Sequence, residues 1–308
     1  MAGQIVRFHG HLPTITRRKT APMSDLPFRY RFAADELAAI KECHDTHGFV
    51  LVADMLDERT HQSLCQDVRR QLIPDGTMPA GRGNIYQTTF VEHSPTLLSL
   101  LDDRRFMAVA ETLGGTTELA VHRSAAIVRQ PGDNGMTWHS DYCWPVQWPP
   151  KSASQHLNHR REGVSLWFYL TGSNPENGGV ALMPNSHRPD WPGPDGFDLT
   201  ADRHSFHRRG TPARGYLGMD IPGVLPIRSQ PRDLVIFDIV TYHGVFPHTG
   251  NETRLSAALV FRPDRQPFAA PWPLTEQAKA FLATVPAHLR PYLKTYVGLD
   301  RDWKPETT

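Results

Sequence analysis

The sequence predicts a mainly β fold of the antiparallel barrel or jelly-roll type, with flanking helices. Short runs rich in β-branched and aromatic residues follow one another from Leu119 onward. Clusters of Gly, Pro, Asn and Asp separate these runs, and no helical pattern alternates with them. Many short strands joined by turns are typical of sheets that pack on each other or close on themselves. The runs expected to form strands are 119–128, 164–170, 180–183, 234–237 and 255–261.

The chain is expected to form an N-terminal arm, residues 1–27, and a single domain, residues 28–308. A length of 308 residues would allow two domains, but barrels and sandwiches exceed about 200 residues as one unit. The arm is basic and lacks the apolar segment of a secretory signal. The β core spans about 119–263. Helices are expected over 275–300, broken by Pro286 and Pro291.

Two helices and one strand are expected before the β core. Apolar residues at helical spacing predict a helix over 33–43, and Gly48 follows where a helix ends. The β-branched run 49–52 predicts a strand. Helical spacing then resumes after Asp57 and continues to Leu72. This arrangement is common and carries no functional signal of its own.

Composition excludes several classes of function. The chain has 33 Lys and Arg against 32 Asp and Glu, a net charge of +1, so it lacks the basic excess of a protein that binds nucleic acid or an anionic membrane surface. It has 3 cysteines and no C-x-x-C pair, which favours a reduced, cytoplasmic protein. No apolar run approaches the 18 or so residues of a membrane-spanning helix. We therefore expect no nucleic-acid or membrane partner, and a monomer or homodimer.

Two histidines and one aspartate form the candidate metal site. His139 and Asp141 follow the turn 131–135, and residues two apart on a strand point to the same side. His243 ends a further strand about one hundred residues later. Two imidazoles and one carboxylate on one face of a metal form the facial triad of non-haem Fe(II) oxygenases. The alternative for the His-x-Asp pair alone is two polar residues that bind no metal.

An arginine with a nearby hydroxyl supports the metal interpretation. Arg254 lies eleven residues after His243 on the following strand, and Ser256 falls on the same side of that strand. A guanidinium binds a carboxylate through two parallel hydrogen bonds. A 2-oxoglutarate-dependent oxygenase needs such an anchor, because its cosubstrate chelates iron at one end and leaves a carboxylate at the other.

The order of these motifs resembles the phytanoyl-CoA dioxygenase family of Fe(II)/2-oxoglutarate oxygenases, from about residue 35 to 263. The most specific stretch is the apolar run 164–170 leading to 177–188, which has the Asn-Gly-Gly turn and an ending similar to the family's Pro-Gly-Ser-His. Asn185 stands where the family usually has Gly, and Asn tolerates positive φ better than other non-Gly residues. His187 closes the same turn.

The resemblance implies a double-stranded β-helix of the jelly-roll, cupin-like type, and Fe(II), 2-oxoglutarate and O2 as cofactor and cosubstrates. It implies that His139, Asp141 and His243 are the iron ligands. It also implies that Arg254 is the 2-oxoglutarate anchor. Ser256 is expected beside that anchor, and Trp167 matches a strand position that lines the cosubstrate pocket in some relatives. His248 is a rival for the third ligand, and the spacing to Arg254 favours His243; His248 is then expected near the substrate.

The substrate-binding residues are expected in the segment that directly follows Asp141. Tyr142 and Trp144 are the candidates for substrate contact, against the alternative of a packed, Pro-stiffened loop. Cys143 is expected to be a buried filler, because no base partner is indicated. The Pro- and Gly-rich segment 188–232 reads as a long insertion, either a functional lid that recognises an acidic group or a solvated basic loop. The smaller basic cluster 156–161 has the same two interpretations.

The sequence therefore predicts a dioxygenase that hydroxylates an unactivated C–H bond of a small-molecule metabolite, with conversion of 2-oxoglutarate to succinate and CO2. Halogenases of this superfamily have Gly or Ala at the position of Asp141, so the carboxylate favours hydroxylation. Desaturation, epoxidation or ring rearrangement is the alternative outcome. A non-catalytic jelly-roll metal-binding or sensor protein and a zinc hydrolase are the other classes considered.

Overall fold

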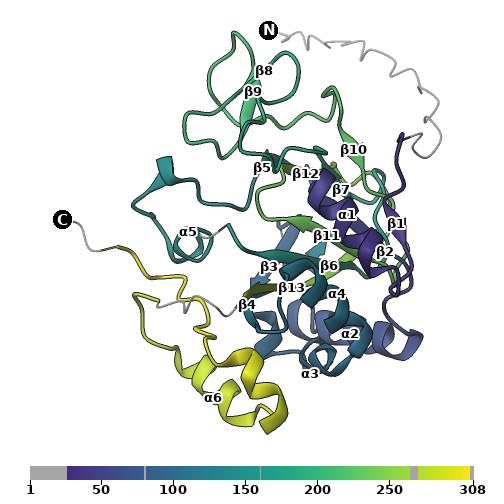
Figure 1. Cartoon of the computed structure of the whole chain (residues 1–308), viewed down its shortest axis with the longest axis vertical. Coiled ribbons are helices and arrows are strands. Elements are labelled where there is room, and N and C mark those ends of the chain that lie inside the picture. Colours follow the sequence, from purple (N-terminus) through teal and green to yellow (C-terminus); the bar gives the residue numbers. More distant parts are fainter. Residues whose placement is uncertain (1–25, 80, 160, 264–269, 306–308) are drawn as a thin grey trace, which may run out of the picture.

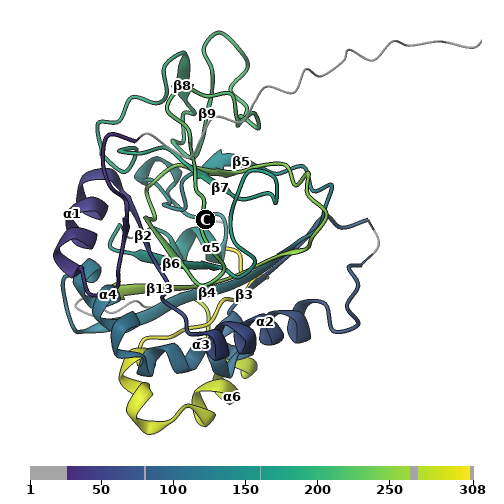
Figure 2. The ribbon, with the colours of Figure 1, turned by 90° about the vertical axis from the view of Figure 1, so that its right-hand side faces the viewer.

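Two sheets lie face to face, with helices on one side and the segment 188–232 on the other (Figures 1 and 2). This arrangement comes from a computed structural model that describes residues 26–79, 81–159, 161–263 and 270–305. Most of the predicted N-terminal arm therefore lies outside the described residues. Across those described ranges, no helix has the length and apolar character needed to cross a membrane.

The larger sheet has seven strands in the order β1-β2-β11-β6-β13-β4-β3. All neighbours are antiparallel except β1 and β2, which are parallel. The central strands are long, apolar runs that are buried on both faces, which explains their high content of Val, Leu, Ile and Phe. The strands are β1 (Arg31–Phe32), β2 (Phe49–Val52), β3 (Asn84–Thr88), β4 (Leu119–Arg129), β6 (Val164–Tyr169), β11 (Leu234–Asp238) and β13 (Arg254–Pro263).

The smaller sheet has four antiparallel strands in the order β10-β7-β12-β5. It faces the larger sheet, and the two sheets together form the open jelly roll (Figure 2). The fold class that the sequence predicts is confirmed. The strands are β5 (Met136–His139), β7 (Val180–Leu182), β10 (Leu225–Pro226) and β12 (His243–Val245).

All the helices except α5 cover the outer face of the larger sheet (Figure 2). Asp57 and Asp103 cap the N-termini of α2 and α4 by accepting hydrogen bonds from backbone N–H groups of the first turn. Thr275 caps α6 in the same way. The helices are α1 (Leu37–His47), α2 (Glu58–Leu72), α3 (Pro95–Ser99), α4 (Arg104–Gly114), α5 (Ala153–Leu157) and α6 (Glu276–Thr284), with 3-10 turns at Phe90–Glu92, Leu100–Asp102, Pro145–Gln147 and Ala287–Leu293.

Several element boundaries differ from the sequence expectation. The first helix begins at Leu37 rather than residue 33, because residues 33–36 form a separate turn, and it ends at Gly48 as expected. C-terminal helical structure stops at Leu293, shortly after Pro291. The expectation missed α4 and β3, although the Asp103 cap and apolar residues at helical spacing mark α4 in the sequence.

Each central strand presents alternate residues to two different environments. Leu166 and Phe168 of β6 pack outward against the helices, whereas Ser165 and Trp167 point to the space between the sheets. Strand β4 contains a bulge. Val260 pairs with Arg123 and Phe261 pairs with Val121, so His122 is the extra residue. A bulge of this kind re-aims side chains and is frequent next to active sites.

The segment 188–232 packs apolar residues onto the outer face of the smaller sheet, while its basic residues His204, Arg208, Arg209 and Arg214 stay exposed, as the solvated-loop interpretation expects. It contains a hairpin of β8 (Phe197–Leu199) and β9 (Phe206–Arg208). Phe197 and Phe206 join Trp138 and Tyr242 in one buried apolar cluster. Strand β10 at the end of the segment pairs with β7, so this part of the predicted insertion belongs to the smaller sheet.

Candidate active site

His139 and His243 lie directly opposite each other on neighbouring strands. His139 is the last residue of β5, His243 is the first residue of β12, and the two are register partners. Their ring centroids are 4.3 Å apart. The expectation that His243 ends a strand is wrong. β11 ends at Asp238, and a turn closed by a hydrogen bond from the Thr241 N–H to the Asp238 carbonyl carries the chain to the other sheet, where His243 opens β12.

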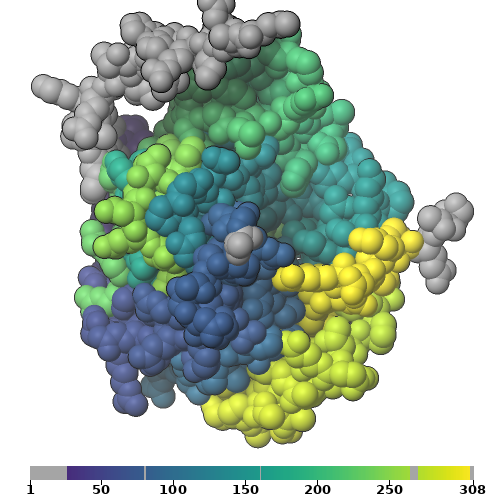
Figure 3. Space-filling view, turned by 180° about the vertical axis from the view of Figure 1, so that it is seen from behind, coloured from purple at the N-terminus to yellow at the C-terminus, as the bar shows by residue number. Residues whose placement is uncertain are grey.

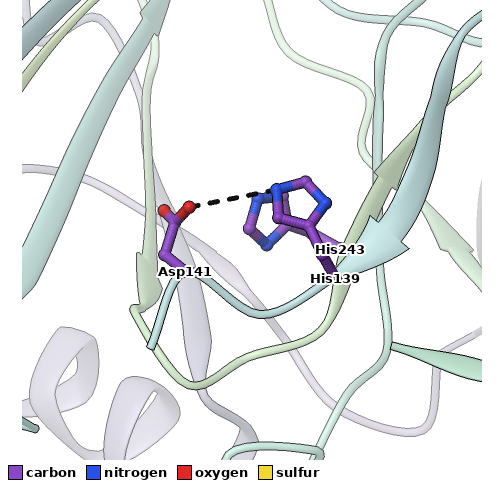
Figure 4. A group of neighbouring side chains, drawn as sticks. All are labelled: His139, Asp141 and His243. Carbon is purple, nitrogen blue, oxygen red and sulfur yellow. Dashed lines mark ion pairs between the residues drawn. The ribbon is translucent and has the colours of Figure 1, made fainter. Parts of the chain in front are cut away.

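Asp141 joins the two histidines from the bend after β5 (Figure 4). Its Oδ1 lies 3.9 Å from Nε2 of His139. Asp141 does not approach His139 because residues two apart on a strand share one side, since β5 ends at His139. Neighbouring backbone contacts fix the bend instead: Ser140 N–H donates to the His204 carbonyl and Tyr142 N–H donates to the Ile239 carbonyl.

The two imidazoles present the same nitrogen to the shared space. Nδ1 of His139 lies 2.8 Å from the Thr137 carbonyl, and Nδ1 of His243 lies 3.0 Å from the Thr241 carbonyl. A carbonyl oxygen only accepts, so Nδ1 carries the proton in each ring and Nε2 is left as the lone-pair donor. One ligand atom from each of His139, Asp141 and His243 lies within 4.8 Å of the others. This donor set fits an iron ion.

Burial and mutual charge set the protonation of this group. Burial lowers the pKa of His139 to about 4, and His243 adds to the effect. Burial alone would raise the pKa of Asp141, but electrostatic interactions with His243, Arg123 and His139 outweigh it and the net pKa is lowered. At neutral pH His139 is therefore neutral and Asp141 is ionised, as metal ligation requires.

Arg254 opens β13 on the inward face of the larger sheet and is almost fully buried. Its guanidinium donates to the Gly178 carbonyl and lies 5.4 Å above the Tyr169 ring. Its Nε has no hydrogen-bond partner among the described residues. Burial lowers the pKa of Arg254 to about 10, so the side chain remains charged. A buried guanidinium with a vacant donor fits a carboxylate ligand.

Ser256 and Trp167 lie on the same inward face. Ser256 follows Arg254 by two residues on β13, and Trp167 is stacked on Tyr169 on β6, with ring centroids 6.2 Å apart. The indole Nε1 of Trp167 also lacks a hydrogen-bond partner in the described part of the chain. The structure thus brings Arg254, Ser256 and Trp167 to the inner face of two strands that are hydrogen-bonded neighbours.

His248 lies outside the group formed by His139, Asp141 and His243. Its Nε2 is 2.8 Å from the Glu252 carbonyl, and its backbone bridges Asn177. Burial lowers the pKa of His248, and Arg254 adds to the effect. The histidine is therefore bonded to its own turn, beside the segment that carries Arg254.

The two aromatic candidates for substrate contact differ in exposure. Trp144 is buried in the cluster beneath the segment 188–232, donates to the Ser140 hydroxyl at 3.1 Å, and has the Arg203 guanidinium 4.4 Å above its ring. Tyr142 is half-buried and meets Trp144 edge-on at 5.1 Å. Cys143 is buried, and burial raises the pKa of its thiol, as expected for a structural cysteine.

A cavity of about 750 Å³ opens onto His139. The segment 188–232 supplies one wall, including Asp202 and His204. The His204 ring lies 5.7 Å from the His139 ring. Sequence reasoning counted His204 only as part of a basic loop, because nothing in the sequence shows that its backbone carbonyl accepts the Ser140 N–H and fixes it beside the site.

Two inward arginines of β4 were also missed. Arg129 is the register partner of Arg254 and forms an ion pair with Asp133 at 2.6 Å. Arg123 lies 3.9 Å from Oδ2 of Asp141. The inward and outward side chains of a strand alternate, and this rule applied to 119–128 could have placed Arg123 inside the fold. The bulge at His122 shifts the alternation by one residue, and the sequence does not reveal where the shift occurs.

Comparison with a family model identifies residues 44–256 as a match to "Phytanoyl-CoA dioxygenase (PhyH)". Among curated proteins, the chain is similar to an ectoine dioxygenase of Halomonas elongata, with 26% identity over 81% of this chain and 76% of that protein. An ectoine dioxygenase of Bordetella bronchiseptica is 28% identical over 68% of this chain and 70% of that protein.

Solved structures share the fold. The epimerase SnoN in complex with Fe3+, alpha ketoglutarate and nogalamycin RO has a TM-score of 0.57 and 19% identity, and covers 89% of this chain and 96% of its own. HygX from Streptomyces hygroscopicus, with nickel and 2-oxoglutarate bound, has a TM-score of 0.55 and 16% identity, and covers 84% of this chain and 94% of its own.

Proposed function

The chain belongs to the phytanoyl-CoA dioxygenase family, and from this premise we propose that it hydroxylates an unactivated C–H bond of a small-molecule metabolite. It is a non-haem Fe(II)/2-oxoglutarate-dependent oxygenase, with Fe(II), 2-oxoglutarate and O2 as cofactor and cosubstrates. When bound, these groups supply the oxidant for C–H cleavage while 2-oxoglutarate becomes succinate and CO2.

His139, Asp141 and His243 hold the iron in this proposal. One observation carries it: two imidazoles on paired strands aim Nε2 at the same space as an ionised carboxylate. The strand pairing and the two Nδ1–H bonds set the ring orientations before metal binds, so little conformational freedom is lost on binding.

Arg254, Ser256 and Trp167 form the 2-oxoglutarate site in the same proposal. The vacant Nε of Arg254 supports a carboxylate at that point, because a buried donor without a partner costs about 1–3 kcal/mol. Ser256 can donate its hydroxyl to the same carboxylate from the next inward position on β13. Trp167 supplies an apolar wall and an indole N–H.

The carboxylate of Asp141 favours hydroxylation, because it occupies a coordination position that a halide would otherwise need. Desaturation, epoxidation and ring rearrangement use the same protein ligands and remain the alternative outcomes. The position of the substrate relative to the iron decides among them, and the mass of the product distinguishes them. A protein that binds metal without turnover is disfavoured by the buried Arg254, which such a protein does not need.

The cavity on His139 is the proposed substrate site, since about 750 Å³ is ample for a small molecule. Tyr142 directly follows Asp141 and is half-buried, so it is the better candidate for contact, whereas Trp144 is buried in the apolar cluster and His248 lies in a separate turn. Arg208 and Arg209 form ion pairs with Asp220 at 2.5 Å and Asp198 at 3.2 Å. These arginines are therefore engaged within their own segment.

The carboxylate of Asp202 lines the same cavity. Burial alone would raise its pKa, but hydrogen bonds from Thr200 and from the His204 N–H outweigh this and lower it. The exposed Asp202 side of the cavity is thus ionised, and this supports a neutral or cationic substrate, of the kind found in secondary metabolism, over an acidic one.

An anaerobic titration with Fe(II) and 2-oxoglutarate tests the cofactor assignment, read by the metal-to-ligand absorption of the complex. Wild-type protein is expected to form it, and His243→Ala is expected not to. Succinate formation is then measured with size-matched compounds that carry an amine, a hydroxyl or a carboxylate, with ectoine included. Absence of the complex in wild-type protein contradicts the assignment, and stimulation by carboxylates alone contradicts the substrate class.

A further inference from the structure

The two oxygens of the Asp141 carboxylate face different partners. Oδ1 lies 3.9 Å from Nε2 of His139, on the side of the candidate iron site. Oδ2 lies 3.9 Å from Nη2 of Arg123, on the side of the larger sheet. The carboxylate is mostly buried between these two groups, so its two oxygens are in different electrostatic environments.

Arg123 is held in place independently of Asp141. Its Nη1 donates to the side-chain oxygen of Asn158 at 2.6 Å. The backbone carbonyl of the same Asn158 accepts the N–H of Cys143 at 2.8 Å. Asn158 thereby ties the guanidinium to the chain two residues beyond Asp141, and the arginine and the carboxylate keep a fixed relation.

The bulge in β4 creates this arrangement. His122 and Arg123 are consecutive, yet both reach the same segment: Nε2 of His122 lies 2.8 Å from the Leu157 carbonyl, next to the Arg123–Asn158 bond. On a regular strand two consecutive side chains point to opposite faces, so the extra residue is what allows both contacts.

The segment that carries Asn158 is itself supported from the C-terminal part of the chain. Ala153 and Leu157 of α5 pack with Trp272, Leu299 and Trp303. Figure 3 shows the yellow C-terminal segment next to the teal surface that precedes β6. Asn158 is therefore held in place by packing, and it keeps Arg123 in position when the Asp141 carboxylate binds a metal ion.

We propose that Arg123 is a positioning residue that keeps Oδ2 of Asp141 away from the iron, so that Asp141 supplies a single oxygen and leaves a coordination position open for 2-oxoglutarate. The proposal rests on the proposed iron ligands. A carboxylate can bind a metal through one or both oxygens, and a fixed guanidinium on one oxygen leaves only the other to the metal. Without Arg123, the second oxygen is free to occupy a position that the cosubstrate needs.

The test uses Co(II) in place of iron, because its visible spectrum reports the number and kind of ligands. Arg123→Met removes the charge and keeps much of the side-chain volume. With Co(II) alone, the Met variant is expected to show an altered visible spectrum with metal affinity retained. Its Kd for 2-oxoglutarate at saturating Co(II) is expected to rise about ten-fold or more, in the range typical of substitutions at groups that orient metal ligands.

Three further variants make the result specific. Arg123→Lys keeps the charge and is expected to restore most of the wild-type spectrum. Asn158→Ala keeps Arg123 but removes the hydrogen bond that holds its guanidinium. This variant is expected to shift the spectrum in the same direction as Arg123→Met, by a smaller amount. It also serves if Arg123→Met fails to fold. Arg232→Met removes an arginine that is paired with Asp54 at 2.8 Å, and is expected to match wild type.

Two outcomes overturn the proposal. A wild-type Co(II) spectrum in both Arg123→Met and Asn158→Ala shows that Arg123 does not act on Asp141. A spectrum that departs from wild type only after 2-oxoglutarate is added shows that Arg123 binds the cosubstrate itself. Failure of the wild-type protein to bind Co(II) with 2-oxoglutarate, or retention of that binding in His243→Ala, contradicts the proposed iron ligands instead.

Discussion

The two faces of the seven-stranded sheet carry residues of opposite character, although the same strands supply both. The outer face of β6 and β13 has Leu166, Phe168, Leu259 and Phe261, which pack against the helices. The inner face has serine, tryptophan and arginine at the alternate positions. The outer face excludes water over a continuous apolar surface, whereas the inner face leaves polar atoms of Arg254 and Trp167 without partners among the described residues.

The outer face of the sheet therefore contributes mainly to stability, and the inner face mainly to ligand binding. Burial of apolar area stabilises the fold at about 25 cal/mol per Å², and the outer face supplies most of it. The buried arginines of the inner face cost desolvation free energy that a bound ligand would offset. Substitutions on the two faces are therefore expected to have separable effects, on unfolding and on ligand binding.

Asp141→Ala is expected to have the largest effect on function. It removes a proposed iron ligand on the inner side, so metal-dependent succinate formation is expected to fall below detection, while Tm stays within a few degrees of wild type. Activity assays and thermal unfolding check the two parts. Asp198→Ala, which breaks a surface ion pair, is the control. Undiminished succinate formation would remove Asp141 from the site.

Phe168→Ala is expected to have the largest effect on stability. The side chain is fully buried against Phe106, with ring centroids 5.9 Å apart. Its loss is expected to lower the free energy of unfolding by about 3–5 kcal/mol. Urea unfolding measures this change, and Ser165→Ala on the other face is the control. A Kd for 2-oxoglutarate that changes while stability does not would contradict the separation of the two faces.

Arg254→Gln is expected to raise the KM for 2-oxoglutarate about 30- to 5000-fold, because loss of one partner of a buried charge pair costs about 2–5 kcal/mol. Its stability is expected to stay near wild type, since the guanidinium is buried without a carboxylate partner in the described residues. Steady-state kinetics and urea unfolding give both numbers. Arg232→Gln is the control, and an unchanged KM would place the cosubstrate carboxylate elsewhere.

His122, at the bulge between the faces, is expected to make stability depend on pH. Burial lowers its pKa to about 3, and Arg262 adds to this effect. The unfolded chain takes up a proton near the ordinary pKa of about 6.5, and the folded chain does not. Stability is thus lost as pH falls from about 6.5 toward 3.

The variant His122→Gln has no imidazole to take up this proton in the unfolded chain. The slope of its unfolding free energy against pH is therefore expected to be smaller than that of wild type, by up to about 1.4 kcal/mol per pH unit. Urea unfolding between about pH 7 and pH 5 measures the slope for both proteins. Equal slopes would show that His122 is protonated in the folded state as easily as in the unfolded one.

Asn185→Ala is expected to have the smallest effect. Asn185 has a φ of 65° in the turn before His187, and a β-carbon without a stabilising polar group is strained there. A loss of about 1–2 kcal/mol is expected for Ala, and a smaller loss for Asn185→Gly, which adopts this φ freely. Thermal unfolding compares the two, and a Gly variant less stable than the Ala variant would assign the effect to the bond between Asn185 and His47 instead.

Local sequence patterns were sufficient to predict those elements that a few neighbouring residues define. The Asp57 cap, the strand 49–52 and the turn at Asn185 appear where the sequence places them. Element boundaries and weakly apolar segments such as β3, β8 and β9 were missed, because their apolar residues are few and pack against partners distant in the chain.

The sequence by itself determined the family, the jelly-roll class and the set of residues proposed for iron and 2-oxoglutarate, because residue types and their order along the chain carry that information. Only the tertiary structure decided how these residues meet. Strand pairing set His139 opposite His243, and the bulge at His122 aimed Arg123 at Asp141. Packing of 188–232 placed His204 beside the site. Each of these contacts depends on register and on residues far apart in the chain, and no local pattern records them.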